Sequence, residues 1–285
     1  MKKILFLILF PCISFMLLAR EGTIFDNLSV ESTILKTGKK YAIYLPPDYE
    51  TSQRSYPVLY LLHGGGGNQA EWVQHGEVKR IADKTINEGN ATAMIIVMPD
   101  ASGPNRGYAN NPGGDWLYED FFFQEFIPYI EKTYRIRSGK RFRSIAGLSM
   151  GGKGTFTYAL HHPEMFRSAC PLSAATFPLT IEDGKERLPQ RYPGITDTQI
   201  EKYFSDQGII ELITNIPENR KNAVRWYIDC GDDDALDQVY IGNCLIHIAM
   251  REKEIPHEFR IRDGGHTWSY WRSALPEVLK FVTFP

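Results

Sequence analysis

The chain has 285 residues, of which 43% are hydrophobic and 13% aromatic, and its 32 basic and 34 acidic residues give a net charge of −2. Such a composition excludes intrinsic disorder, because enough apolar surface is present to build a core. The lack of a basic excess argues against nucleic acid as a partner. Length alone leaves one domain or two open.

The first residues combine two lysines with a short apolar run. Lys2 and Lys3 precede the apolar residues 4–19, which is the order found in secretory signals. A membrane-spanning helix needs about 20 apolar residues, and Pro11 would interrupt this one. We therefore expect a signal peptide over residues 1–19 and a single domain over residues 20–285. The mature chain, without a stable membrane span, would be secreted or periplasmic, either free or tethered to the outer membrane.

Three cysteines remain after signal removal. Cys12 leaves with the signal, and Cys170, Cys230 and Cys244 stay, without the spacing of a metal site. Buried thiols are the simplest expectation. A disulfide between Cys230 and Cys244 stays open, because spacing alone does not reveal the geometry.

The mature chain begins with two β-rich runs and continues with alternating strands and helices. Residues 30–36 and 40–46 predict an antiparallel pair joined at Thr37-Gly38. Near-continuous apolar runs of buried-strand length then follow, at residues 56–62, 93–98, 142–146, 167–172, 224–229 and 258–262. The alternation predicts the α/β class, with a mostly parallel sheet and helices on both faces.

Two segments between these strands stand out. Residues 118–134 show helical periodicity, and we expect their apolar side chains to be core, namely Phe122, Phe126, Ile127 and Ile130. Residues 174–222 are long for a connection and rich in proline, so we expect a cap-like insertion over the sheet.

Ser149 is the first candidate for chemistry. It lies in the sequence Gly-Leu-Ser-Met-Gly, directly after the strand at 142–146 and before a helical stretch. This is the context of a nucleophile elbow, a sharp turn in which Gly147 and Gly151 leave room for the backbone. Placement at a strand-to-helix turn favours a nucleophile over a plain glycine turn.

A serine nucleophile requires a base, usually a histidine, and an acid that orients this base. After a nucleophile elbow, the acid comes first along the chain and the histidine second. His266 lies in a glycine-rich loop after the last strand, whereas His247 falls in a helix and His257 at a strand start. We therefore expect His266 to be the base.

The acid should come from the loop after the strand at 224–229. Asp229 falls within that strand and Asp237 opens the next helix, which leaves a run of three candidates, Asp232, Asp233 and Asp234. Spacing does not choose among them. A calcium site would also explain so many carboxylates, but the spacing of an EF-hand is absent, and we expect no metal.

The oxyanion donors are expected from two places. The sequence His63-Gly64-Gly65-Gly66-Gly67 follows the strand at 56–62, where such a loop supplies one backbone N–H. The residue after the nucleophile supplies the other. Gly65 and Met150 are therefore the predicted donors.

These motifs together resemble the esterase D-like branch of the α/β-hydrolases. That branch includes feruloyl and acetyl-xylan esterases, S-formylglutathione hydrolases and the antigen 85 mycolyltransferases. The likeness extends from about Lys39 to the C-terminus. It implies an α/β-hydrolase fold, a catalytic triad of Ser149, Asp234 and His266, and no cofactor. Asp233 remains an alternative if the loop is shifted by one residue.

With the predicted export, the resemblance implies a serine esterase that cleaves feruloyl or acetyl esters on plant cell-wall polysaccharide such as xylan. An acylated polysaccharide or oligosaccharide would be its partner and an acyl-enzyme its intermediate. A siderophore trilactone esterase, an acyltransferase and a non-catalytic carbohydrate-binding protein are the alternatives. Loop aromatics could stack on a sugar or a phenolic group, and we expect substrate contacts from Tyr108, Trp116, Phe177 and Trp268.

Overall fold

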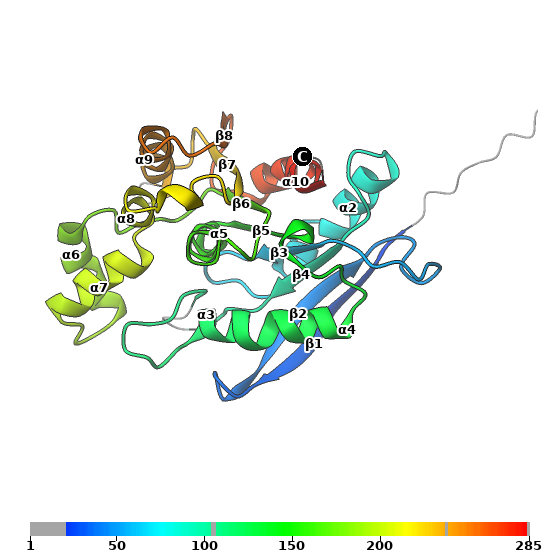
Figure 1. Cartoon of the computed structure of the whole chain (residues 1–285), viewed down its shortest axis with the longest axis horizontal. Helices are drawn as coiled ribbons and strands as arrows, with labels where there is room; N and C mark the ends of the chain where they lie inside the picture. Colours follow the sequence, from blue (N-terminus) through cyan, green and yellow to red (C-terminus); the bar gives the residue numbers. More distant parts are fainter. Residues whose placement is uncertain (1–20, 104–106, 237–238, 284–285) are drawn as a thin grey trace, which may run out of the picture.

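The computed structural model describes residues 21–103, 107–236 and 239–283. The predicted signal peptide, Cys12 and Asp237 lie outside these ranges. Within them, one eight-stranded sheet has the order β1-β2-β4-β3-β5-β6-β7-β8 (Figure 1). Its strands are β1 (Thr23–Ser32), β2 (Thr37–Leu45), β3 (Val58–Leu62), β4 (Ile95–Pro99), β5 (Arg143–Leu148), β6 (Ser168–Leu172), β7 (Arg225–Gly231) and β8 (His257–Arg262).

The sheet is mostly parallel, as predicted. Strands β3 to β8 pair in parallel, while β1 and β2 pair antiparallel and β2 joins β4 in the same way. Every residue of β3, β4, β5 and β6 is buried. Helices cover both faces of a parallel sheet, and this explains why these strands are apolar throughout.

The N-terminal pair differs from the prediction in its turn. The chain reverses at residues 33–36, where Lys36 has a φ of 55°, and not at Thr37-Gly38. Gly38 lies inside β2, opposite Glu31 of β1. The dipeptide resembles a turn in composition, but the strand pairing continues through it.

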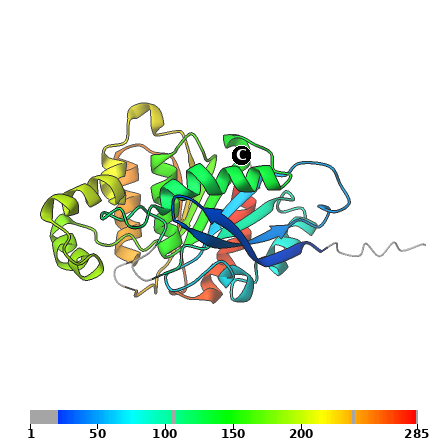
Figure 2. The same ribbon diagram turned by 90° about the horizontal axis from the view of Figure 1, so that it is seen from below.

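Two groups of helices cover the sheet (Figure 2). α2 and α10 bury one face, with α1 beside them, and α3 to α5, α8 and α9 bury the other. No helix in the described ranges is long and apolar enough to cross a membrane. The bounds are α1 (Glu71–Gln74), α2 (Val78–Asn87), α3 (Tyr118–Phe121), η1 (Phe122–Phe126), α4 (Ile127–Thr133), η2 (Lys140–Phe142), α5 (Met150–His161), α6 (Ile181–Arg191), α7 (Asp197–Gln207), α8 (Ile209–Thr214), η3 (Glu218–Arg220), α9 (Val239–Glu252) and α10 (Trp268–Thr283).

The predicted helix over residues 118–134 is continuous and includes a π-helical turn. The segments α3, η1 and α4 follow one another without a break. All four side chains of the predicted apolar stripe are buried. Their role as core residues is confirmed.

The predicted insertion lies between β6 and β7. It contains α6, α7 and α8, and we call residues 174–222 the cap. α6 and α7 enclose a small core of their own, built from Leu188, Ile200, Tyr203 and Phe204. In Figure 1 they stand at one end of the molecule, away from β1 and β2.

Candidate active site

Ser149 lies between the end of β5 and the start of α5, in a strained backbone conformation. Its φ of 53° and ψ of −115° are rare for a residue with a side chain. A Cβ on Gly147 would lie 2.5 Å from the carbonyl oxygen of Gly151, and one on Gly151 would lie 2.7 Å from that of His63. The turn can therefore form only with glycine on both sides of the serine.

The glycine-rich loop after β3 faces the same space. Gly64, Gly65, Ser149 and Met150 all line one pocket. A Cβ on Gly65 would meet no atom within 4 Å, so a ligand can approach this backbone closely. Met150 is the first residue of α5, where backbone N–H groups have no partner within the helix. Backbone donors on two sides of Ser149 could thus meet a developing oxyanion.

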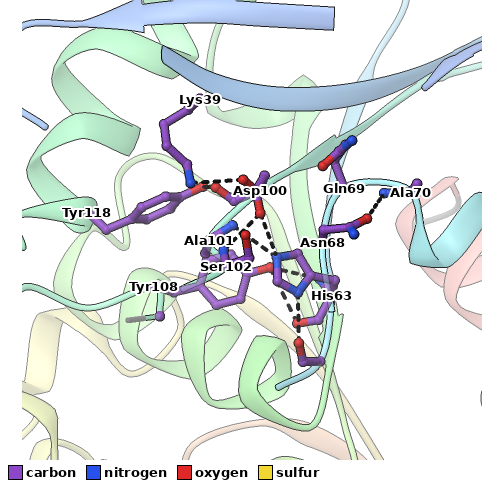
Figure 3. Close-up of polar contacts among 12 residues, drawn as sticks. Lys39, His63, Asn68, Gln69, Ala70, Asp100, Ala101, Ser102, Tyr108 and Tyr118 are labelled. Carbon is purple, nitrogen blue, oxygen red and sulfur yellow. Dashed lines mark hydrogen bonds and ion pairs between the residues drawn. The ribbon is translucent and has the colours of Figure 1, made fainter. Parts of the chain in front are cut away.

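The side chain of His63 anchors the glycine-rich loop through hydrogen bonds (Figure 3). Its Nε2 accepts a hydrogen bond from the N–H of Ala101 at 3.0 Å, so Nδ1 carries the proton and donates to the carbonyl of Gly64 at 2.7 Å. Its own backbone N–H donates to the hydroxyl of Tyr108 at 2.8 Å. Burial lowers the pKa of His63, in keeping with a neutral ring. The sequence analysis did not identify this positioning role, although the place of His63 between a buried strand and four glycines was a signal.

Asp100 and Lys39 form a buried ion pair next to His63 (Figure 3). The Lys39 ammonium lies 2.9 Å from the carboxylate, which also accepts the N–H of Ser102. Burial by itself would raise the pKa of Asp100, but these two donors lower it below its usual range. Asp100 therefore stays charged and fixes the segment that holds the His63 ring.

Asp234 and His266 come from the loops after β7 and β8 and contact each other directly. His266 Nδ1 lies 2.8 Å from Oδ2 and 3.1 Å from Oδ1 of Asp234, whose side chain is fully buried. A carboxylate can only accept, so Nδ1 carries the proton and Nε2 is left as a base. His266 lines the same pocket as Ser149.

The other two aspartates of the run point outward. Asp232 and Asp233 are exposed and, with Asp263, bring carboxylate oxygens within 4.8 Å of one another. Exposed acidic groups of this kind are common without a bound ion. The structure thus brings one of the three candidates, Asp234, to His266.

Trp271 orients the His266 ring. The two rings meet edge to face, with centroids 4.8 Å apart, and the indole Nε1 donates to the hydroxyl of Ser173 at 3.2 Å. Since Trp271 is buried and Ser173 follows β6, the histidine rests against a fixed part of the fold.

The pocket has a volume of about 530 Å³ and a mixed lining. The apolar part of the lining consists of three aromatic rings, from Phe177, Trp268 and Trp271, and the half-exposed side chain of Leu236. Charged groups line it as well, at Glu71, Lys153 and Arg191. Such a space could hold a planar or sugar-like group beside the serine.

Two of the four predicted substrate contacts do not line this pocket. Phe177 and Trp268 do, but Tyr108 and Trp116 are each 3% exposed and belong to the hydrophobic core. The indole of Trp116 donates to the carbonyl of Gly107 at 2.8 Å. Their place in the chain suggested a loop near the site, but both rings are used to pack that loop onto the body.

Asp229 has a structural role, consistent with its exclusion as the acid. It is completely buried within β7 and accepts hydrogen bonds from the hydroxyls of Tyr227 and Tyr270. The guanidinium of Arg262 lies 3.0 Å from its carboxylate. The network ties β7, β8 and α10 together beneath the loops that carry Asp234 and His266.

Comparisons with known proteins agree with this architecture. Residues 32–282 match the family model described as "Putative esterase". The structure of a ferulic acid esterase is similar, with 36% sequence identity, coverage of 93% of this chain and 98% of that chain, and a TM-score of 0.80.

This chain spans nearly all of one curated relative and only a small part of another. An acetyl esterase of Caldicellulosiruptor saccharolyticus is 23% identical over 90% of this chain and 97% of its own. An endo-1,4-beta-xylanase/feruloyl esterase of Xylanibacter ruminicola is 37% identical over 52% of this chain, which spans only 22% of that relative.

The order of the strands and the similarity of this chain to solved structures confirm the predicted α/β-hydrolase fold. The family match confirms the resemblance stated from the motifs. The chain belongs to the esterase family.

Proposed function

We propose that this esterase is exported and hydrolyses feruloyl or acetyl esters on plant cell-wall polysaccharide such as xylan, through an acyl-enzyme. Residues 20–285 would form the mature, single-domain enzyme. His266 contacts the buried Asp234 and lines the same pocket as Ser149, and this arrangement carries the catalytic part of the proposal. The similarity to a ferulic acid esterase and to an acetyl esterase supports the substrate class.

The mechanism assigns each of these groups one task. The Ser149 hydroxyl attacks the ester carbonyl carbon while Nε2 of His266 takes its proton. The N–H groups of Gly65 and Met150 stabilise the tetrahedral oxyanion. The C–O bond to the alcohol then breaks, and His266 returns the proton to the departing oxygen. Asp234 stabilises the imidazolium that forms between these steps.

Water completes the cycle. His266 deprotonates a water molecule, which attacks the acyl carbonyl, and Ser149 leaves with the proton as the free acid is released. The strained turn helps here, because the serine hydroxyl is held at the start of α5, where the helix dipole favours negative charge.

Substitution of the nucleophile tests the chemistry. Ser149→Ala is expected to lower kcat for 4-nitrophenyl acetate by at least about 10³-fold, because no other group can form the acyl-enzyme. The matched control is Ser29→Ala, at an exposed position of β1, which should keep the wild-type rate. Near-normal turnover by the Ser149 variant would eliminate the mechanism.

A substrate panel tests the specificity. The wild-type enzyme should release ferulate from feruloylated arabinoxylan or acetate from acetyl-xylan, and Ser149→Ala should release neither. A catecholate trilactone and an acyl acceptor other than water serve as comparison substrates. Turnover of only these two would favour a siderophore esterase or an acyltransferase, and binding of xylan without turnover would favour a carbohydrate-binding protein.

A further inference from the structure

Two cationic side chains line the cap side of the pocket that contains Ser149. Lys153 lies one helical turn after the serine in α5, and Arg191 is the last residue of α6. Both also line an adjoining cavity of about 50 Å³, so they stand at the boundary between the two spaces. Like charges gathered there repel each other, and an anion beside them would relieve that repulsion.

Lys153 has a neutral partner in place of a carboxylate. Its Nζ donates to the hydroxyl of Tyr203 in α7 at 2.6 Å, with the ammonium 5.0 Å from the centre of that ring. Across the described part of the chain, no carboxylate forms an ion pair with Lys153, although Lys39 and Lys202 each have one. The charge of Lys153 is thus held in place without being neutralised.

Among the described residues that line the pocket, the one with a carboxylate is Glu71. It comes from α1, next to the glycine-rich loop, and it forms no ion pair with Lys153. Burial raises the pKa of Glu71, while His75 and the Gly64 backbone lower it. The two cationic side chains therefore come from α5 and the cap, and the Glu71 carboxylate comes from the side of the glycine-rich loop.

We propose that Lys153, together with Arg191, forms an anion subsite that binds a carboxylate carried by the ester substrate. The inference rests on the proposed function, since the ester to be cleaved must reach Ser149 in the same pocket. The carboxylate could belong to the alcohol portion, as in a uronate sugar, or to the acyl portion, as in a dicarboxylate half-ester. Lys153 would give it a charge-assisted hydrogen bond, and the planar guanidinium of Arg191 could add a second contact.

Paired substrates that differ in one charge test the subsite. On the alcohol side, caffeoylquinate is compared with its methyl ester, in which the quinate carboxylate is neutral, and caffeate release is measured. On the acyl side, 4-nitrophenyl hydrogen adipate is compared with 4-nitrophenyl hexanoate. The readout is the ratio of kcat/KM for the charged to the uncharged member of each pair.

Lys153→Met should lower this ratio by at least about tenfold in one of the two pairs, mainly through KM, as expected for a lost charge-assisted hydrogen bond. Lys153→Arg should keep the ratio within about twofold of wild type, because the charge remains. Tyr203→Phe should keep it too, since it removes the hydrogen bond to the cap but not the charge. Lys185→Met is the matched control, at an exposed position of α6.

The outcomes separate the subsite from the chemistry. An unchanged ratio in both pairs, or an equal loss for charged and uncharged esters, would overturn the subsite even with Ser149→Ala inactive. Activity of Ser149→Ala would instead overturn the proposed function. If Lys153→Met does not fold, the salt dependence of the wild-type enzyme tests the subsite instead. Added salt should lower kcat/KM for the charged ester more than for its partner, and equal effects would overturn the subsite.

Discussion

Asp234 differs from the two aspartates before it in its burial. Its side chain is fully inaccessible and accepts a hydrogen bond from Nδ1–H of His266, whereas Asp232 and Asp233 are exposed. In the proposed mechanism, Asp234 fixes the tautomer of His266 and stabilises the imidazolium. Both tasks would need a carboxylate at position 234.

We therefore expect Asp234→Asn to lower kcat for 4-nitrophenyl acetate by about 10²- to 10⁴-fold, because the amide can leave the ring in the wrong tautomer. Asp233→Asn is the matched control and should keep the rate within about twofold, since surface substitutions rarely perturb a site. Steady-state kinetics of both variants measure the effect. A larger loss in the Asp233 variant would mean that the loop is shifted by one residue.

The sequence was sufficient for some of these residues and not for others. The meeting of Ser149 and His266 at one pocket could be predicted because a strand end and a glycine-rich turn fix where a side chain emerges. The choice among three consecutive aspartates needed the loop geometry. Tyr108 and Trp116 were placed in the pocket wrongly, because position in a loop does not reveal whether a ring faces the pocket or the core.

At the scale of elements, the end of α5 is fastened to the cap through one histidine. His161 Nδ1 lies 2.7 Å from the carboxylate of Glu119 in α3, and Nε2 lies 2.6 Å from the carbonyl oxygen of Asp206 in α7. Both partners are acceptors, so both ring nitrogens must donate and the ring is cationic. Burial would lower the pKa of His161, but Glu119 and the Asp206 carbonyl raise it.

This connection should weaken as the pH rises. A group whose pKa is raised by folding stabilises fully below its ordinary value of about 6.5, and the benefit disappears as the pH rises through the raised value. His162 and Asp206 also face the ring. His161→Gln should lower the free energy of unfolding by about 1 kcal/mol at pH 6 and by less at pH 9.

Urea unfolding at both pH values, followed by circular dichroism, measures this difference. His75→Gln, at an exposed position after α1, is the control and should show no such pH-dependent difference. An equal destabilisation by His161→Gln at pH 6 and pH 9 would contradict the charged connection.

The elements themselves could largely be predicted, and the exceptions have a physical reason. The buried strands were recognised because a strand covered on both faces must be apolar throughout. The first part of β1, residues 23–29, was missed, since this edge strand is mostly exposed and has no such pattern. The turn before β2 was misplaced because Gly38 can sit in a strand as well as in a turn.

At the scale of the whole molecule, the three cysteines in the described ranges are all free. Cys170 in β6 and Cys230 in β7 are buried, and burial raises the pKa of both thiols. Cys244 in α9 is partly exposed. The disulfide between Cys230 and Cys244 that the sequence left open is not formed.

Native protein that spans residues 20–285 should therefore react with Ellman's reagent at one thiol, Cys244, and unfolded protein should react at all three. The reason is that reaction needs an accessible thiolate, which burial suppresses. Cys244→Ser should abolish the native reaction. Two reactive thiols in the native state, or only one after unfolding without reductant, would contradict the assignment.

The tryptophans beside His266 give the molecule an intrinsic fluorescence probe. Trp268 lies between Trp72 and Trp271, with centroids 5.3 Å from each, and two of these indoles line the pocket. A molecule that enters displaces water from the indoles, and tryptophan emission depends on that solvation. Occupancy of the site could then be followed by fluorescence in the Ser149→Ala variant, with the proposed polysaccharide substrate and without a coloured reagent.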